Sequence, residues 1–344
     1  MRAAALAEDV FRENPLHPGA VHFLIHAYDD PIHAPLGLRA ARAYSKIAPA
    51  AAHAQHMTTH IFLAMGMWDD VVAQNAIASG HDHDKWAPGH YTHWYGYGLL
   101  QLGRNREALG HLETVKANLP TTGEGPRAAV LTFMRADYLL NTEEWDSPVA
   151  AWSIPLAPGF RDARAADAFV RGVQSLRRSD RAAADTSLAA LSRLAREAEA
   201  AKAPSGNALV LLAPVVMELE LTALRRLADG NSAEAVELLQ RAAALEDRMP
   251  MEFGPPAIVK PSHELLGDVL LHLGRAQEAK LQYARALELA PRRARSLLGL
   301  ARAAERAGDI KTARASWTTL KEIWHDADRE LPALAEVRRA VDDH

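Results

Sequence analysis

The sequence predicts an all-α protein folded as one repetitive solenoid, and three observations support this prediction. Apolar residues recur at helical spacing along the chain, and no segment alternates convincingly enough to predict a strand. Small or turn-forming residues return at intervals typical of a pair of helices. Proline-containing joints separate the helical segments. Because the units of such an array contact mainly their neighbours, we expect a single α-solenoid over residues 1–344.

Composition narrows the classes of function. The chain has 39 Lys and Arg against 43 Asp and Glu, a net charge of −4, so no global positive field favours nucleic acid or an anionic membrane. Cysteine is absent, which excludes disulfides, thiolate metal sites and cysteine nucleophiles. No apolar run approaches the ~18 residues of a membrane span, and no signal peptide is visible. We therefore expect a cytoplasmic protein that binds neither nucleic acid nor membrane.

The clearest repeat unit covers residues 260–291. Its restrictive positions, counted from Lys260, are Gly267 at 8, Leu270 at 11, Gly274 at 15, Ala279 at 20, Tyr283 at 24, Ala286 at 27 and Pro291 at 32. This pattern resembles the tetratricopeptide repeat, a helix–turn–helix unit of 34 residues whose small positions let its helices A and B pack closely. The resemblance implies a right-handed superhelical α-solenoid of such units.

The turn position extends the register to other units. Glycine occupies it at residues 66, 103, 230 and 308, whereas Asn141 and Ser179 occupy it in two degenerate units. The long joint that follows Asn141 suggests a weak subdivision into histidine-rich repeats over 1–145 and C-terminal repeats over 160–344. Residues 1–13 look like a helix B without its helix A. We expect them to expose an apolar edge, through which a homodimer could form.

Histidine is concentrated near the start of the chain, where eleven of the sixteen lie between residues 17 and 93. His22 and His26 are four residues apart, as are His56 and His60, so each pair projects from one side of its helix. The resemblance implies that helix A lines the concave groove and that these positions face it. The segments HPGAVHFLIHAYDDPIHA and HAQHMTTHIF also resemble a group of bacterial tetratricopeptide-type proteins with a histidine-rich front half, mostly without assigned activity.

Paired histidines on neighbouring helices are a recognised way to build a metal site in a helical scaffold. The predicted ligands are His22, His26, His56, His60, His90 and His93. Imidazole suits several divalent transition metals, of which we expect zinc, with copper as an alternative. The paired motifs HFLIH and HMTTH lack the glutamate of HExxH proteases.

The remaining site candidates are acids and groove residues. Asp29 and Asp30 follow His26 by one turn and are predicted to orient a ligand or take a proton. Glu220 and Glu264 reach the histidines only if the superhelix curls back, a curvature that the sequence leaves open. The predicted substrate-binding residues are His53, Trp94, Tyr95, Tyr97, Lys260, Asp268 and Arg302.

Three functions remain open. The first is a metal-dependent hydrolase, in which a histidine-bound ion activates water for a small-molecule or peptide substrate in the concave groove. The alternative is a non-catalytic interaction scaffold that binds a peptide there, with the histidines as hydrogen-bonding or pH-sensitive contacts. The third is a dicopper oxidase or copper-handling protein.

Overall fold

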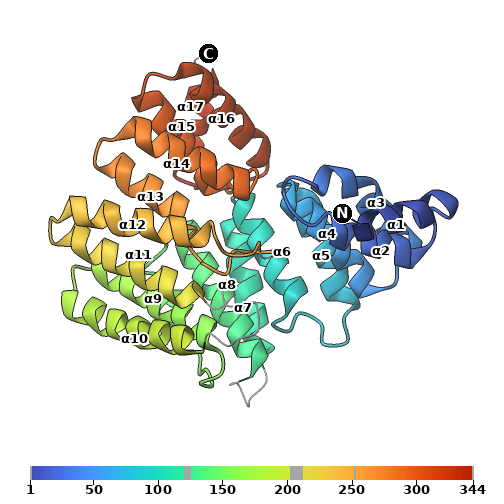
Figure 1. Cartoon of the computed structure of the whole chain (residues 1–344), viewed down its shortest axis with the longest axis horizontal. Helices are drawn as coiled ribbons and strands as arrows, with labels where there is room; N and C mark the ends of the chain where they lie inside the picture. Colours follow the sequence, from blue (N-terminus) through green and yellow to red (C-terminus); the bar gives the residue numbers. More distant parts are fainter. Residues whose placement is uncertain (1, 120–124, 202–211, 252, 343–344) are drawn as a thin grey trace.

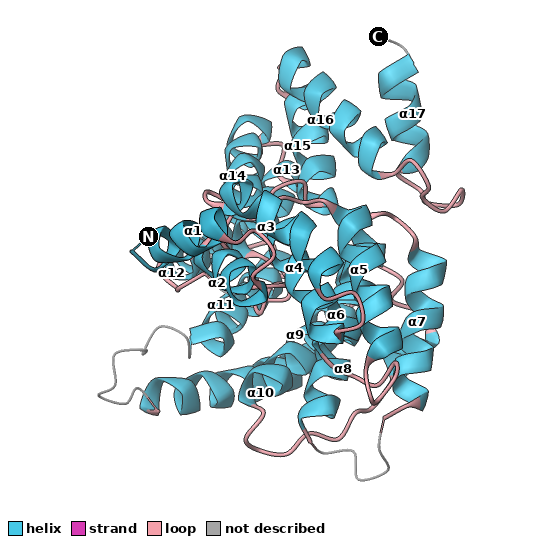
Figure 2. Ribbon diagram, turned by 90° about the vertical axis from the view of Figure 1, so that its right-hand side faces the viewer, coloured by secondary structure: helices cyan, strands magenta, loops and turns pink. Residues whose placement is uncertain are grey.

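A computed structural model describes residues 2–119, 125–201, 212–251 and 253–342. Within these ranges the protein consists of helices joined by loops, with no strand (Figure 2). The helices are α1 (Arg2–Glu13), α2 (Pro18–Ala27), α3 (Ala34–Ile47), α4 (Ala52–Ala64), α5 (Trp68–His81), α6 (His90–Gln101), α7 (Asn105–Ala117), α8 (Pro126–Thr142), α9 (Arg161–Arg177), α10 (Arg181–Ala200), α11 (Ala213–Ala228), α12 (Ser232–Glu246), α13 (Ser262–His272), α14 (Ala276–Leu289), α15 (Ala294–Arg306), α16 (Ile310–Ile323) and α17 (Leu334–Asp342), with a 3₁₀ turn η1 (Pro148–Ala151).

Consecutive helices pack as antiparallel pairs, which confirms the predicted α-solenoid. In the clearest unit, α13 and α14 are joined by a turn in which Gly274 has a φ of +77°. Tyr283 of α14 packs against Gly267 of α13 and Gly299 of α15, where a Cβ atom would meet its ring at less than 3.0 Å. The small residues of the repeat pattern thus let one aromatic ring fill the space between three helices.

One unit departs from the pattern. Its left-handed turn residue is Glu143, with a φ of +59°, whereas Asn141 lies inside α8. No long helix B follows; η1 and an extended segment take its place. Arg135 of α8 fixes that segment by donating to the carbonyls of Val149 and Ala150 at 2.9 and 2.7 Å. The subdivision at residues 145–160 stays a prediction.

The array is arranged as a curve whose far end returns to its middle. Helices α1–α5 project to one side of α6–α8, and α13–α17 lie above α6 (Figure 1). Gln101 at the end of α6 accepts from the backbone N–H of Ala294 and, through its carbonyl, from the indole N–H of Trp324, each at 3.0 Å. Trp68 of α5 donates to the carbonyl of Arg292 at 2.9 Å. The superhelix therefore does curl back, which was the condition for Glu220 and Glu264 to reach the histidines.

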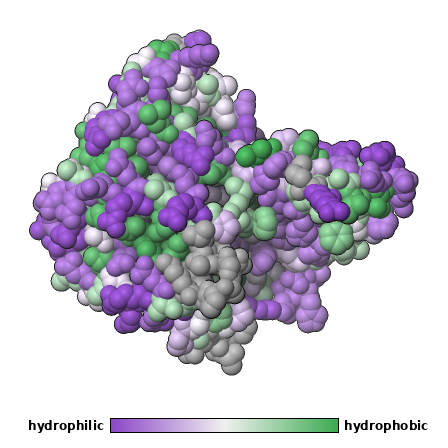
Figure 3. Space-filling model, in the orientation of Figure 1, coloured by the Kyte–Doolittle hydropathy of each residue, from purple (hydrophilic) through white to green (hydrophobic). Residues whose placement is uncertain are grey.

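The first helix forms an edge of the array. α1 packs on α2 through Ala4 and Ala7, while Leu6 is 66% exposed and Val10 is 42% exposed. Apolar patches are visible over the projecting helices α1–α5 in Figure 3. The expected apolar edge is present from Arg2 onward, Met1 being outside the described residues, and a homodimer through it stays a prediction. None of the described helices combines the length and apolar character needed to cross a bilayer.

Candidate functional site: a histidine cavity

Helices α2, α4 and α6 bring six histidines into one continuous chain of ring contacts. The ring centroids are 5.2 Å apart for His53 and His22, 4.8 Å for His22 and His26, and 5.9 Å for His26 and His60. The chain continues through His56, 5.2 Å from His60, to His90, 6.2 Å from His56. The rings of His22, His26, His56 and His60 therefore lie in one cluster, while their role as ligands of one common ion stays a prediction.

Two of these histidines are held from behind by side chains outside the cluster. His60 Nδ1 lies 2.5 Å from Asp29 Oδ2, and His56 Nδ1 lies 2.8 Å from Asn75 Oδ1. Asn75 donates its own amide N–H to the carbonyl of Val71, so its oxygen accepts from His56. Both rings therefore have Nδ1 engaged by an oxygen outside the cluster, which leaves Nε2 as the nitrogen for a ligand, the arrangement found behind metal-bound histidines.

A cavity of about 460 Å³ opens beside the cluster, lined by five histidines: His26, His53, His56, His60 and His90. Its other wall is the 82–92 segment, which contributes Asp82, Asp84 and Tyr91. Trp86 anchors this segment by packing on His111 at a centroid distance of 5.7 Å. The volume lies in the range of small-molecule sites.

Burial favours the neutral form of four histidines in the cluster. Burial, followed by repulsion from neighbouring rings, lowers the pKa of His22, His53 and His90. The pKa of His26 is lowered for the same reasons, although Asp29 opposes the change. Neutral imidazole is the state that binds a metal ion, so the cluster is chemically ready to act as a ligand set.

No complete metal site is assembled in advance. Among the described residues, no group of three or more histidine, aspartate or glutamate side chains is placed to hold one ion as they stand. Within the cluster, His22 Nε2 and His26 Nε2 lie 3.1 Å apart. A third ligand therefore requires a side chain to rotate, and His53 and His60 are the nearest candidates.

Several predicted site residues lie elsewhere. His93 is bonded through Nε2 to Asp137 at 2.7 Å and stacks on Phe133, so it does not join the other histidines. Asp30 accepts from His33 Nδ1 at 2.6 Å and from two backbone N–H groups at the start of α3, a structural role. Asp137 of α8 thus engages His93 from the following repeat and His33 engages Asp30, so neither residue is placed in the histidine cluster as expected.

Three aromatic residues of α6 lie in three different environments. Trp94 packs on His56 and His60 at 4.8 and 4.6 Å and forms the wall behind them. Tyr95 faces helix α7, where it donates to Glu107 at 2.8 Å. Tyr97 is buried against Arg293 of the C-terminal repeats. Neither tyrosine lines the histidine cavity, which corrects the substrate-binding prediction for both.

The predicted C-terminal candidates do not reach the cavity either. Glu264 is fully buried, where it accepts from Arg293 Nε at 2.7 Å, Lys260 Nζ at 2.9 Å and Ser296 Oγ at 2.5 Å. Glu220 is also fully buried and accepts from Ser262 Oγ at 2.7 Å. Lys260, Asp268 and Arg302 line a different cavity, the C-terminal groove described below.

The sequence argument missed residues that support the cavity. Asn75 lies on α5, nineteen positions after His56, and no sequence pattern connects the two. Asp82 and Asp84 had a visible signal, because they belong to a polar segment directly before the His90 helix. They line the cavity, whereas Asp29 stands behind His60.

Comparisons with known proteins give only distant similarities. No family model and no curated protein matches the chain. The tetratricopeptide-repeat domain of P58(IPK) is 13% identical over 99% of this chain and 98% of its own, with a TM-score of 0.30. A chain of the Naa15/Naa10 complex bound to HypK-THB is 11% identical over 99% of this chain and 64% of its own, with a TM-score of 0.28. A chain of the APC/C hetero-tetramer Cut9-Hcn1 is 11% identical over 98% of this chain and 93% of its own, with a TM-score of 0.30. No residue role follows from TM-scores this low.

His56 makes the stability of the metal-free protein depend on pH. Burial, and then repulsion from His60, lowers its pKa to about 3. Below a pKa of about 6.5, His56 is protonated in the unfolded chain, whereas in the folded chain it stays neutral until about pH 3. Stability should therefore fall as pH decreases through this window, by about 1.4 kcal/mol per pH unit for this one group.

The pH effect is measured by urea denaturation of metal-free protein between pH 7 and 4. A His56→Leu variant should show a shallower dependence of unfolding free energy on pH than wild type. His325→Ala, which alters an exposed histidine beside Asp69, is the control and should leave the slope unchanged. Equal slopes for wild type and His56→Leu would contradict the assignment.

Proposed function

We propose that this chain is a helical-repeat binding scaffold and that its cluster of six histidines binds a divalent transition metal ion, with zinc as the preferred ion. The observation that carries the proposal is the 3.1 Å separation of His22 Nε2 and His26 Nε2. Two nitrogen ligands of a tetrahedral zinc ion, each at 2.0–2.1 Å, are about 3.3 Å apart. The pair therefore already has nearly the spacing that one ion requires.

Two further features support a metal at this place. His60 is oriented by Asp29 in the manner of a carboxylate that fixes a metal-binding histidine. His53 and His60 flank the His22–His26 pair at ring distances of 5.2 and 5.9 Å. A third ligand would come from either of these two side chains.

The metal proposal is tested by titrating zinc, cobalt and copper into protein stripped with a chelator, followed by calorimetry and elemental analysis. We expect about one zinc ion per chain in wild type and loss of binding in the His22→Ala/His26→Ala double variant. Asp29→Asn should weaken zinc by about 10- to 100-fold, because the carboxylate only orients a ligand. His325→Ala, remote from the cavity, should bind zinc as wild type does.

The titration has outcomes on both sides. Retention of full zinc affinity by the double variant would overturn the site, and absence of binding to wild type would overturn the proposal. The same 3.1 Å separation would then be a hydrogen bond between two neutral rings, and the chain would be a scaffold without metal. Binding of two copper ions, with an absorption band after oxygenation, would favour the copper alternative.

A hydrolase is the second candidate function, favoured by the carboxylates beside the histidines. Asp82 and Asp84 line the same cavity, and Asp84 is engaged by Arg127. A bound ion would lower the pKa of a coordinated water to about 7, and Asp82 would take its proton. Zinc-loaded protein assayed on ester, amide, phosphate and glycoside substrates tests this, with Asp82→Asn expected to lose turnover while keeping zinc.

A further inference from the structure

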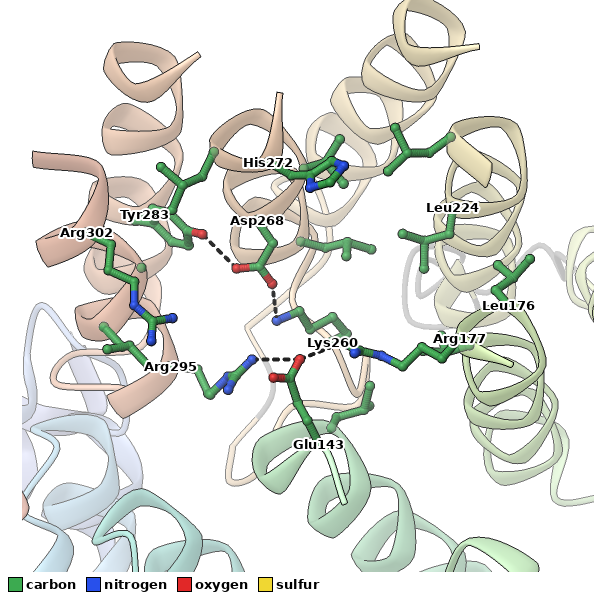
Figure 4. A pocket seen from close by; sticks show the side chains of 18 of the residues that line it. Glu143, Leu176, Arg177, Leu224, Lys260, Asp268, His272, Tyr283, Arg295 and Arg302 are labelled. Atoms are coloured by element: carbon green, nitrogen blue, oxygen red, sulfur yellow. Dashed lines mark hydrogen bonds and ion pairs between the residues drawn. The ribbon is translucent and has the colours of Figure 1, made fainter. Parts of the chain in front are cut away.

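The C-terminal repeats enclose a groove of about 1260 Å³ that shares no lining residue with the histidine cavity. Its walls come from the end of α8 and from α9, α11, α13, α14, α15 and α17. We call it the C-terminal groove. Figure 4 shows Arg295 and Arg302 on one side, Glu143 at the base, and Leu176 and Leu224 on the other side, from which Arg177 reaches toward Glu143.

The charged wall is a network of paired groups. Glu143 lies between two arginines, 2.6 Å from Arg177 and 3.1 Å from Arg295. On α13, Asp268 lies 2.6 Å from Lys260 and accepts from the Tyr283 hydroxyl at 2.7 Å (Figure 4). One carboxylate thus serves two guanidinium groups at the base of the groove.

Positive charge exceeds negative charge along the groove. The lining residues include five cations, Arg177, Lys260, Arg295, Arg302 and Arg306, and four carboxylates, Glu143, Asp268, Glu305 and Glu336. Glu305 accepts from the Trp317 indole at 2.7 Å, and Arg306 donates to the carbonyl of Leu271 at 3.2 Å. Among the described residues no carboxylate pairs with Arg306, so its charge is available to a ligand.

The opposite wall is apolar. It is formed by Leu176 and Val173 of α9 and by Leu224 and Leu227 of α11, with Phe169 deeper in the wall. Arg177 follows Leu176 and stands where the two walls meet (Figure 4). A ligand that satisfies both walls must carry its negative charge at one end and its apolar surface along the rest.

We propose that the C-terminal groove binds a small organic anion with an apolar body, its carboxylate or phosphate meeting the cations that line the groove and its body lying against the apolar wall. An acidic peptide fits less well, because its charged and apolar side chains alternate along an extended backbone, whereas the walls separate the two characters. This binding site is independent of the metal proposed for the histidine cavity.

The test uses the full chain in the presence of a chelator, so that its outcome is separate from that of the metal experiment. 8-Anilinonaphthalene-1-sulfonate is bound as a fluorescent probe and displaced by dodecanoate, dodecyl phosphate, dodecyltrimethylammonium or a hexapeptide of alternating Glu and Leu. We expect displacement by the two anions, whose relative strength distinguishes carboxylate from phosphate. Arg177→Gln should weaken them about 10-fold, the effect of one lost charge-assisted hydrogen bond.

Two more variants keep the test independent of any one fold defect. Arg306→Gln alters an exposed cation outside the buried network, and Leu224→Asn alters the apolar wall alone. Both should weaken dodecanoate, whereas Arg285→Gln, which removes an arginine paired with Asp247 and Glu288 away from the groove, should not. Equal displacement by dodecyltrimethylammonium, displacement by the peptide alone, or unchanged affinity in both Arg306→Gln and Leu224→Asn would overturn the proposal.

Discussion

Replacing Arg293 with Met should destabilise the protein by about 3–5 kcal/mol, the usual cost of removing one partner of a buried ion pair. Arg293 is 1% exposed and Glu264 is fully buried. Burial by itself would raise the pKa of Glu264, but Arg293 and Lys260 outweigh it and hold that pKa well below its ordinary value. Without Arg293, the carboxylate keeps its charge in the interior with half of its compensation gone.

The adjacent arginine provides the matched control for this experiment. Arg292 lies on the surface, 3.4 Å from Glu322, and Arg292→Met should change the free energy of unfolding by less than about 0.5 kcal/mol. Urea denaturation of both variants gives the comparison. A Glu264→Leu/Arg293→Met double variant should recover part of the loss, because no unpaired carboxylate remains. Similar midpoints for Arg292→Met and Arg293→Met would refute the structural role of the pair.

Gly66→Ala is expected to be the second strongly destabilising change. Gly66 has a φ of +66°, a conformation that costs an alanine about 1–2 kcal/mol. A Cβ atom there would also lie closer than 3.0 Å to the carbonyl oxygen of Pro291, in the repeats that return to α5. Forcing this contact apart adds about 1–3 kcal/mol and disturbs the bond from Trp68 to the Arg292 carbonyl.

The control for Gly66→Ala is a glycine at the same position of another repeat. Gly230 has a φ of +84°, yet nothing lies within 4 Å of the place that its Cβ atom would take. Gly230→Ala should therefore cost only the backbone term of about 1–2 kcal/mol. Thermal unfolding of the two variants measures the difference, which reports the contact between the N-terminal and C-terminal repeats. Equal losses would mean that this contact contributes nothing to stability.

The sequence determined the fold class and the grouping of the histidines. The glycines at turn positions and the small residues around Tyr283 act between helices close in the sequence, so their spacing alone predicts the repeat unit. The same locality holds for His22, His26, His56 and His60, because a pair four residues apart shares a helix face in any helical repeat.

Only the tertiary structure decided which side chains each candidate meets. His93 bonds to Asp137, forty-four residues away, and His56 bonds to Asn75 on the next helix, neither of which follows from a local pattern. Tyr97 and Glu264 both contact the buried Arg293, which lies 196 residues after Tyr97 in the sequence. A small rotation between successive repeats accumulates along a solenoid, and where its ends meet depends on every interface between them. The sequence could therefore place residues on helix faces. The closure of the superhelix decided that Glu264 is buried in a stabilising ion pair and that the histidine cavity and the C-terminal groove are two separate sites.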